Sequence, residues 1–317
     1  MRVLVTGGAG FIGSHVVDLL VREGHDLTVL DNLSTGSVDN VSSEARFLLG
    51  DVCEPLDEAF AIARPDLVLH LAAQVSVPAS LRRPDHDLAV NLAGTVNLTV
   101  ASARASVQKI IFVSSAAVYG TPQSLPLREE SPTCPLSPYG LSKLSAESYL
   151  RLLCELHGLQ YTILRPANAY GPRQLDSGEG AVIPAFLNQF LCGVDPVIHG
   201  DGRQTRDFVY VGDMAVAVAK ALTRAHGLTL NISTGRGESI RSVWGTLARL
   251  TGWEGEPRFG PARMGDILNS VMANGAARQH LEWAPTVTLS DGLARTVHWA
   301  QQQRLSSRVG SSYRLPS

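Results

Sequence analysis

The stretch Met1-Arg-Val-Leu-Val-Thr-Gly7-Gly8-Ala9-Gly10-Phe11-Ile12-Gly13 joins a short apolar run to a turn with three evenly spaced glycines. Such a turn is typical of a β-strand that leads into a helix whose N-terminus binds a pyrophosphate. The glycines allow a tight turn, a close approach of the backbone to the phosphates, and close packing of the helix on the strand. The spacing is G-x-x-G-x-x-G rather than the commoner G-x-G-x-x-G. A structural turn is the alternative interpretation for the glycines alone.

A second apolar run, Leu27–Leu30, ends at an acidic residue, Asp31. In dinucleotide-binding folds an acid about 20 residues after the glycines accepts a hydrogen bond from the adenosine ribose. No arginine stands at residues 32–37 to bind a 2′-phosphate, so Asp31 favours NAD over NADP. We predict NAD as the cofactor, and this end of the chain supplies the contacts Gly7, Gly10, Phe11, Ile12, Gly13, Asp31 and Asn32.

The composition restricts the class of protein. With 317 residues, of which 44% are hydrophobic, the chain is long enough for one large domain or two merged lobes. A formal net charge of −2 gives no support for binding to nucleic acid or to an anionic membrane. No apolar stretch approaches the roughly 18 residues of a transmembrane helix, and no histidine or cysteine spacing indicates a metal site. We expect a cytoplasmic protein without metal.

Short apolar runs alternate with longer helical patterns in the first half of the chain. The runs are residues 2–6, 26–30, 45–49, 67–71, 109–114 and 161–165, and the clearest helical stretches are 14–23, 90–105 and 139–157. This alternation predicts an α/β fold with a doubly wound parallel Rossmann sheet, whose ligands lie at the carboxyl ends of the strands.

Beyond about residue 166 the sequence becomes richer in glycine, proline and polar loops, which indicates a smaller C-terminal substrate-binding lobe. We expect an NAD-binding domain over 1–166 with a returning segment near 206–228. The substrate-binding lobe would comprise 167–205 and 229–303. Residues 304–317 are polar and contain Gly310 and Pro316, so we expect a flexible tail there.

A second chemical signal is Ser137-Pro138-Tyr139-Gly-Leu-Ser-Lys143. Ser137 is a good helix N-cap and Pro138 suits the first helical position. Tyr139 and Lys143 then lie one turn apart on one face, where the ammonium group stabilises a phenolate. A surface tyrosine and lysine at this spacing would be the ordinary alternative. An apolar run that ends in Ser114-Ser115 favours the catalytic interpretation, because a hydroxyl there could bond a substrate oxygen while Tyr139 moves a proton.

Together these motifs resemble the NAD-dependent epimerase/dehydratase family of nucleotide-sugar enzymes, within the extended short-chain dehydrogenase/reductase superfamily, over about residues 1–300. The segments that carry the resemblance are 6–13, 51–52, 70–74, 91, 114–120, 139–143, 164–173, 200–213 and 263–266. The resemblance implies that Ser115, Tyr139 and Lys143 are catalytic. It implies further cofactor contacts from Asp51, Val52, Leu71, Ala72, Ala73, Gln74, Asn91, Ser114, Tyr139, Lys143 and Pro166. Substrate contacts would come from Ser115, Asn168, Arg206, Arg263, Asp266 and Ser270.

The residues after Ser115 favour one chemistry within the resemblance. Related dehydratases and decarboxylases carry acidic residues near this point, whereas Ala116 and Ala117 cannot transfer protons. The resemblance therefore implies a nucleotide-sugar 4-epimerase of galactose metabolism that interconverts UDP-glucose and UDP-galactose. A glucuronate epimerase, a dehydratase, a reductase or a non-catalytic NAD-binding protein are the alternatives.

Two further expectations follow from the resemblance. In related epimerases, small residues at the position of Ser270 admit N-acetyl groups, so we expect UDP-GlcNAc and UDP-GalNAc to be accepted. Relatives form dimers by packing two helices from each subunit, for which residues 90–105 and 139–157 are the candidates. We therefore predict a homodimer with a UDP-sugar as its small-molecule partner.

Overall fold

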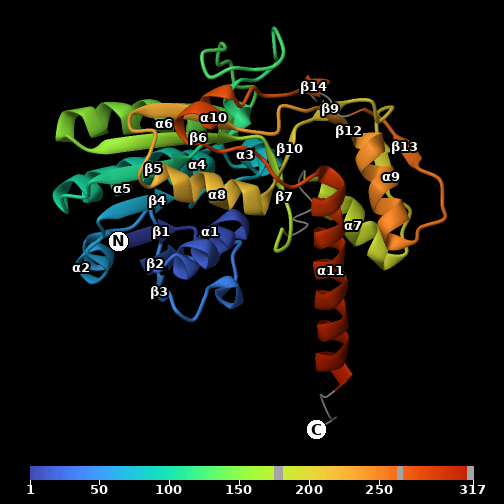
Figure 1. The fold of residues 1–317 in the computed structure, drawn as a ribbon, viewed down its shortest axis with the longest axis horizontal. Coiled ribbons are helices and arrows are strands. Elements are labelled where there is room, and N and C mark those ends of the chain that lie inside the picture. The colour runs from blue at the N-terminus through green and yellow to red at the C-terminus, as the bar shows by residue number, and fades with distance from the viewer. Residues whose placement is uncertain (175–180, 263–266, 313–317) are drawn as a thin grey trace.

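The computed structural model describes residues 1–174, 181–262 and 267–312, with side chains described to residue 305. A parallel seven-stranded sheet forms the centre of the first domain (Figure 1). Its strands are β1 (Arg2–Thr6), β2 (Asp26–Asp31), β3 (Arg46–Leu49), β4 (Leu67–His70), β5 (Lys109–Val113), β6 (Gln160–Pro166) and β11 (Leu228–Ile232). The strand order β11-β6-β5-β4-β1-β2-β3 reverses direction beside β1 and β4. This arrangement confirms the predicted doubly wound sheet, with its switch point at the glycine-rich turn.

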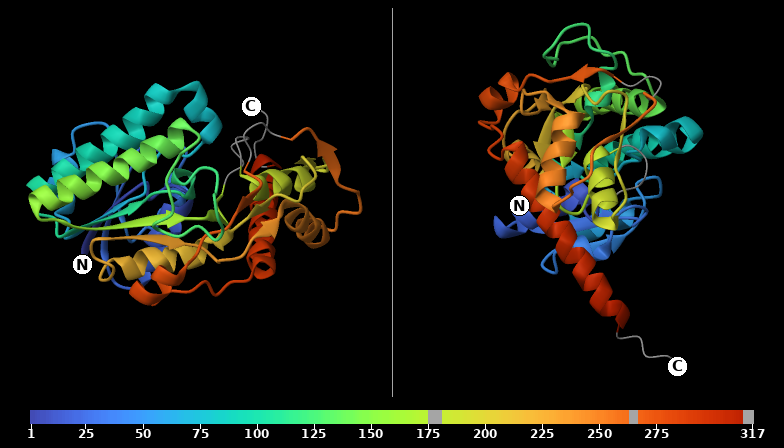
Figure 2. Two further views of the ribbon diagram at one scale, coloured as in Figure 1. Left: turned by 90° about the horizontal axis from the view of Figure 1, so that it is seen from above. Right: turned by 90° about the vertical axis from the view of Figure 1, so that its right-hand side faces the viewer.

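Helices cover both faces of the sheet (Figure 2). One face carries α1 (Phe11–Arg22), α8 (Val211–Ala221) and α10 (Gly275–His280), whose apolar residues share one core with β1 and β11. The other face carries α2 (Asp57–Ala63), α3 (Val77–Arg82), α4 (Pro84–Leu88), the π-helical turn Ala89–Ala93, α5 (Gly94–Arg104) and α6 (Pro138–His157). Except for the edge strand β3, the strands are largely buried on both faces, which explains their nearly continuous apolar sequence.

The second lobe lies beyond the carboxyl ends of the strands (Figures 1 and 2). Its helices α7 (Val182–Cys192), α9 (Ile240–Thr251) and α11 (Leu289–Ser312) pack around Phe186, Phe190 and Trp244. The remaining described strands form small sheets separate from the central one: β7 (Asn168–Tyr170) with β10 (Phe208–Tyr210), β9 (Thr205–Arg206) with β12 (Glu238–Ser239) and β14 (Asn269–Ser270), and β8 (Val197–His199) with β13 (Arg258–Gly260). Among the described residues, two 3-10 turns, Val38–Asn40 and Ala116–Val118, complete the elements of regular structure.

The chain returns to the first domain over a longer stretch than the expected 206–228. Strand β11 pairs with β6 along its whole length, and α10 packs against the same core. Both were expected in the substrate-binding lobe. The short apolar sequence of β11 is compatible with a strand in either lobe, because only the strand with which it pairs determines the lobe to which it belongs.

The segment 304–317, for which we expect a flexible tail, begins within a helix. Helix α11 runs to Ser312 and projects away from the body of the molecule (Figure 2). The glutamines, arginine and leucine at 301–305 are good helix formers, so they extend a helix that begins in the packed lobe.

Within the described chain, no helix combines the length and apolar character needed to cross a bilayer.

Candidate active site

The glycine-rich turn is packed too closely for side chains. Gly7 has a φ of +72°, and a Cβ there would stand 2.5 Å from the backbone nitrogen of Ala72. A Cβ on Gly13 would overlap the carbonyl oxygen of Gly7. The first glycine therefore permits the turn and the third allows α1 to lie directly on β1, as the sequence predicts. The backbone and the N-terminus of α1 form a cradle suited to a pyrophosphate.

Asp31 ends β2 at the same edge and is 8% exposed. Its carboxylate accepts hydrogen bonds from the backbone nitrogens of Ala9, at 3.0 Å, and Leu33, at 2.8 Å. These bonds fix the carboxylate beside the glycine turn, where an adenosine ribose would meet it. Asn32 donates to Asp51 at 2.8 Å, next to the buried Val52. The glycine cradle and this acid fit the NAD that the sequence predicts.

Helix α6 presents the proposed acid–base residues. Ser137 caps it by accepting a hydrogen bond from Gly140 at 3.2 Å, and Pro138 occupies the first turn. Tyr139 and Lys143 follow one turn apart. Lys143 is 2% exposed, and its Nζ lies 4.3 Å from the centre of the Phe112 ring on β5. The helix thus places both side chains at the carboxyl edge of the sheet.

Burial dominates the electrostatics of this pair. It lowers the pKa of Lys143 to about 7, against the opposing effect of the Glu147 and Asp87 carboxylates. Burial raises the pKa of Tyr139, as does Asp87, whereas a hydrogen bond with Ser115 lowers it. An acid–base tyrosine therefore depends on the positive charge beside it and on Ser115.

The two serines after β5 have different surroundings. Ser115 caps the turn Ala116–Val118 by accepting a hydrogen bond from Ala117 at 3.1 Å, and its hydroxyl is within hydrogen-bonding reach of Tyr139. Ser114 is buried, and its hydroxyl donates to Glu147 at 2.6 Å. The Ser115 side chain is therefore available to the reaction, whereas the Ser114 hydroxyl and its backbone amide, which donates to the Leu164 carbonyl at 2.7 Å, are already engaged.

The segment Leu71–Gln74 follows β4 and lies beside the glycine turn. Gln74 and Asn91 exchange two hydrogen bonds of 2.9 Å between the backbone of the first and the side chain of the second. Asn91 lies in the π-helical turn rather than at the start of a regular helix. A carboxylate that the sequence analysis did not single out, Asp87, joins both residues to Ser142 on α6. Its spacing of four residues before Asn91 was the available signal.

The proposed substrate residues come from separate strands of the lobe. Asn168 begins β7 and pairs in register with Phe208, directly after Arg206 and Asp207. Arg206 on β9 stands opposite Ser270 on β14. Pro166, the last residue of β6, pairs with Ile232. Arg263 and Asp266 lie outside the described residues. The structure thus brings Arg206 and Ser270 together from positions far apart in the sequence.

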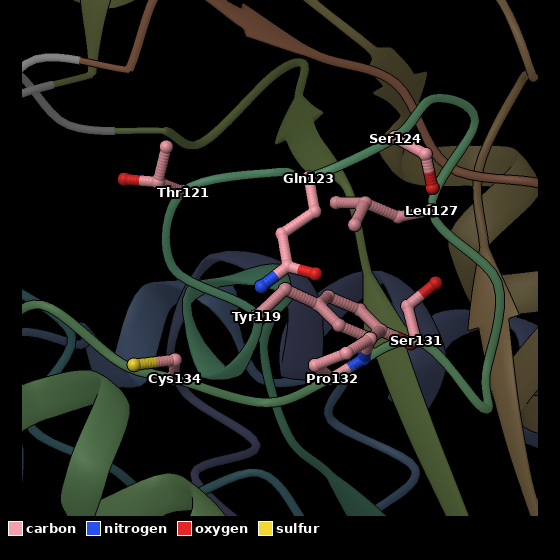
Figure 3. Close-up of a pocket in the computed structure, with 8 residues that line it drawn as sticks. All are labelled: Tyr119, Thr121, Gln123, Ser124, Leu127, Ser131, Pro132 and Cys134. Carbon is pink, nitrogen blue, oxygen red and sulfur yellow. The ribbon is translucent and has the colours of Figure 1, made fainter.

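A small cavity lies beside Tyr119, on the segment that follows the Ala116–Val118 turn. It measures about 60 Å³ and is lined by Tyr119, Thr121, Gln123, Ser124, Leu127, Ser131, Pro132 and Cys134 (Figure 3). The Tyr119 hydroxyl donates to Asn231 at 2.7 Å and accepts from Arg165 at 3.0 Å. None of the proposed cofactor or catalytic residues lines this cavity, so it does not represent the cofactor cleft.

Comparisons with known proteins agree with this geometry. The model of the NAD dependent epimerase/dehydratase family matches residues 3–233. The UDP-glucose 4-epimerase of Mycolicibacterium smegmatis is 40% identical, over 94% of this chain and 98% of the relative. The crystal structure of Thermotoga maritima UDP-glucose 4-epimerase with UDP-glucose has a TM-score of 0.94 and 40% identity, over 96% of this chain and all of that one.

A third comparison concerns N-acetylated sugars. The UDP-N-acetylglucosamine 4-epimerase of Methanobrevibacter ruminantium, solved with UDP-N-acetylmuramic acid, has a TM-score of 0.91 and 34% identity. The alignment covers 95% of this chain and 98% of that one. The likeness therefore extends over both lobes in each case.

Proposed function

Because the chain belongs to the NAD-dependent epimerase/dehydratase family, we propose that it is a UDP-sugar 4-epimerase that interconverts UDP-glucose and UDP-galactose. The observation that carries this proposal is the placement of Ser115, Tyr139 and Lys143 at one edge of the sheet, beside the glycine cradle. Epimerisation at C4 requires a group that takes the proton of the C4 hydroxyl and later returns it, and Tyr139 is that group.

The bound cofactor has a separate task. NAD⁺ bound at this site would supply hydride transfer at C4, in both the forward and the return direction. The glycine turn would hold its pyrophosphate, Asp31 its adenosine ribose, and Asp51 and Val52 would lie beside its adenine. Lys143 would contact the nicotinamide ribose, with segment 71–74 and Pro166 forming the wall of the cleft.

The chain's own residues then perform the proton transfers. Lys143 supplies a positive charge one turn from Tyr139, which favours the phenolate. The phenolate takes the C4 hydroxyl proton, while Ser115 bonds the same sugar oxygen. When the sugar has turned its other face to the cofactor, Tyr139 returns the proton. Both directions use the same two residues, so the reaction is reversible.

The 3-10 turn after Ser115 favours epimerisation over dehydration. Dehydration of a 4-keto sugar requires an additional acid–base pair to expel the 6-hydroxyl. Ala116 and Ala117 occupy this turn and carry only methyl groups. A 4-keto sugar held here is therefore reduced again rather than dehydrated.

The lobe would hold the nucleotide firmly and the sugar loosely. Arg206, with Asn168, would bind the diphosphate, since a guanidinium suits bidentate contact with phosphate oxygens. Firm binding of the diphosphate lets the sugar rotate without leaving the site. Ser270 lies opposite Arg206, and its small side chain would accommodate an N-acetyl group at C2. The similarity to an N-acetylglucosamine 4-epimerase supports the same conclusion.

The assembly that we propose is a homodimer. Helix α6 carries an exposed apolar stripe of Leu141, Tyr149, Leu152 and Leu156, with exposed fractions of 49% to 68%. These residues follow a helical repeat on the side of α6 that faces away from the sheet. Burying this stripe against a second copy would remove it from water.

We propose the cytoplasm as the location, which the four free cysteines support.

Incubation with UDP-glucose, UDP-galactose, UDP-GlcNAc and UDP-GalNAc, separately and without added cofactor, tests this function. Interconversion of the 4-epimers is the expected result. Failure with all four sugars, in protein that contains NAD, would overturn the proposed substrate class. Glucuronate, GDP-linked and dTDP-linked sugars would then be the next substrates to test.

A further inference from the structure

We propose that Asp87 is a positioning residue of this site, an inference that rests on the roles proposed for Tyr139 and Lys143. Its carboxylate fixes helix α6 against segment 71–74 and provides a buried negative charge for the Lys143 ammonium group. Nothing in the reaction described above uses this residue.

Asp87 lies on α4 and is 1% exposed. Its Oδ2 accepts a hydrogen bond of 2.5 Å from the Ser142 hydroxyl on α6. Its Oδ1 accepts bonds from the Gln74 side chain at 2.7 Å and from the Asn91 side chain at 3.1 Å. One carboxylate therefore joins the catalytic helix, the segment after β4 and the π-helical turn.

The position of Ser142 makes this contact relevant to catalysis. Ser142 stands between Tyr139 and Lys143 in α6, and its hydroxyl lies 3.0 Å from the backbone oxygen of Tyr139. Asp87 thus holds the turn of helix that carries both residues. Gln74, which we expect to line the cofactor cleft, is held by the same carboxylate. The Asp87 carboxylate therefore holds both the turn that carries the catalytic residues and the segment that we expect to line the cofactor cleft.

The charge of Asp87 is not cancelled by its hydrogen-bond donors, because all three are neutral. Glu147, the other carboxylate beside Lys143, differs in this respect. It forms ion pairs with Arg165 at 2.6 Å and Arg151 at 2.8 Å. A buried carboxylate with neutral donors retains more of its field than one that is paired. Glu147 has the larger effect on the pKa of Lys143, and Asp87 raises it as well although it makes no ion pair of its own.

The groups that face the catalytic pair come from four elements. Asp87 faces it from α4, Glu147 from α6, Ser115 from the end of β5, and His70 from β4. Burial lowers the pKa of His70 to about 3, so this ring is neutral at ordinary pH. Asp87 raises the pKa of both Lys143 and Tyr139. Loss of its charge should therefore lower both pKa values together.

The test uses the holoenzyme and three variants. Asp87→Asn removes the charge with little change of size. Asp85→Asn is the matched control, because it removes the same charge from the same helix at an exposed position. Ser142→Ala removes the anchoring donor and leaves the charge. For each protein, the absorbance of tyrosinate is measured as a function of pH without substrate. The same measurement is made on that protein with Tyr139→Phe added, and the difference between the two curves gives the pKa of Tyr139.

We expect Asp87→Asn to lower the pKa of Tyr139 by about 0.5 or more, and both limbs of the pH profile of kcat to move to lower pH. Asp85→Asn should change neither. Ser142→Ala should reduce kcat about tenfold with the pKa of Tyr139 unchanged, which a loss of general stability would not produce at saturating substrate.

An unshifted pKa in folded, NAD-containing Asp87→Asn protein would overturn the proposal, as would an equal shift in Asp85→Asn. If Asp87→Asn does not fold, Ser142→Ala decides alone, and a wild-type kcat in that variant rejects the anchoring role. A shifted Tyr139 pKa in a protein that converts no UDP-sugar would instead reject the proposed function and support the role of Asp87.

Discussion

Glu147 and Arg165 form a bidentate ion pair with N–O distances of 2.9 and 2.6 Å, in which the Glu147 side chain is fully buried. Burial raises the pKa of Glu147, but the pair with Arg165 lowers it overall. Arg165 lies on β6 and Glu147 on α6, one turn after Lys143. The pair therefore joins the catalytic helix to the strand that leads into the substrate-binding lobe.

Removal of the Glu147 charge should lower the free energy of unfolding. Glu147→Gln leaves the Arg165 guanidinium buried without its counter-charge, which we expect to lower the free energy of unfolding by about 3–5 kcal/mol. Chemical denaturation of the NAD-containing protein measures this change. Glu155→Gln, at an exposed position of the same helix, should change it by less than about 0.5 kcal/mol. Equal effects of the two substitutions would contradict the importance of the pair.

The close packing of the glycine turn predicts a defect in cofactor retention. A methyl group at Gly13 would overlap the Gly7 carbonyl, so Gly13→Ala should move α1 away from β1 and disturb the phosphate cradle. We expect the purified variant to contain little NAD, measured in the supernatant after denaturation. Gly245→Ala in α9 is the control, because nothing lies within 4 Å of its added Cβ. A Gly13→Ala protein with a full complement of NAD would reject this account of the turn.

The burial of His70 predicts that the free energy of unfolding depends on pH. It is buried between Thr6 and Thr95, at 2.8 and 2.9 Å, and burial lowers its pKa to about 3. Between this value and the ordinary pKa near 6.5 the unfolded chain binds a proton that the folded chain does not. Folding is therefore weakened as the pH falls below about 6.5.

Comparison of the wild type with His70→Gln isolates this contribution. Between pH 7.5 and 5 we expect the wild type to lose about 2 kcal/mol more free energy of unfolding than the variant. His226→Gln, at an exposed site, should behave as the wild type. Identical pH dependence in wild type and His70→Gln would show that the imidazole is not buried in its neutral form.

Ser270 predicts selectivity for the group at C2. Because Ser270 lies opposite Arg206, Ser270→Tyr should fill the space beside the bound sugar. We expect kcat/KM for UDP-GlcNAc to fall at least about tenfold while that for UDP-glucose changes little. Asn269→Tyr, at the exposed neighbouring position, is the control. Equal losses for both sugars in Ser270→Tyr would reject the role of Ser270.

The sequence predicted the features that depend on local pattern. Gly7, Gly13 and Asp31 follow from the spacing of one β-α-β unit, and the Tyr139–Lys143 pair follows from the repeat of a single helix. The structure places Gly13 in α1, Asp31 at the end of β2, and Tyr139 and Lys143 one turn apart in α6, and their roles in binding and catalysis stay predictions. The alternation of strands and helices likewise predicts a doubly wound parallel sheet, which the structure confirms.

Features that depend on contacts between distant segments were not predictable in this way. Asp87 lies in a short polar segment, Pro84-Asp-His-Asp87, whose composition is typical of an exposed turn. It becomes buried because α6 packs over α4 and supplies the Ser142 hydroxyl. In the same way, β11 is identified as a sheet strand only by its pairing with β6. Burial and pairing are properties of the folded chain rather than of its local sequence.

The most direct test of the central claim follows the hydrogen at C4. UDP-glucose that carries deuterium at C4 is incubated with the enzyme in ordinary water, without added cofactor, and the UDP-galactose formed is examined by mass spectrometry and NMR. We predict that the deuterium stays on C4 and that Tyr139→Phe slows the conversion at least about 100-fold. Absence of UDP-galactose with NAD-containing enzyme, or exchange of the label with water, would contradict the proposed function.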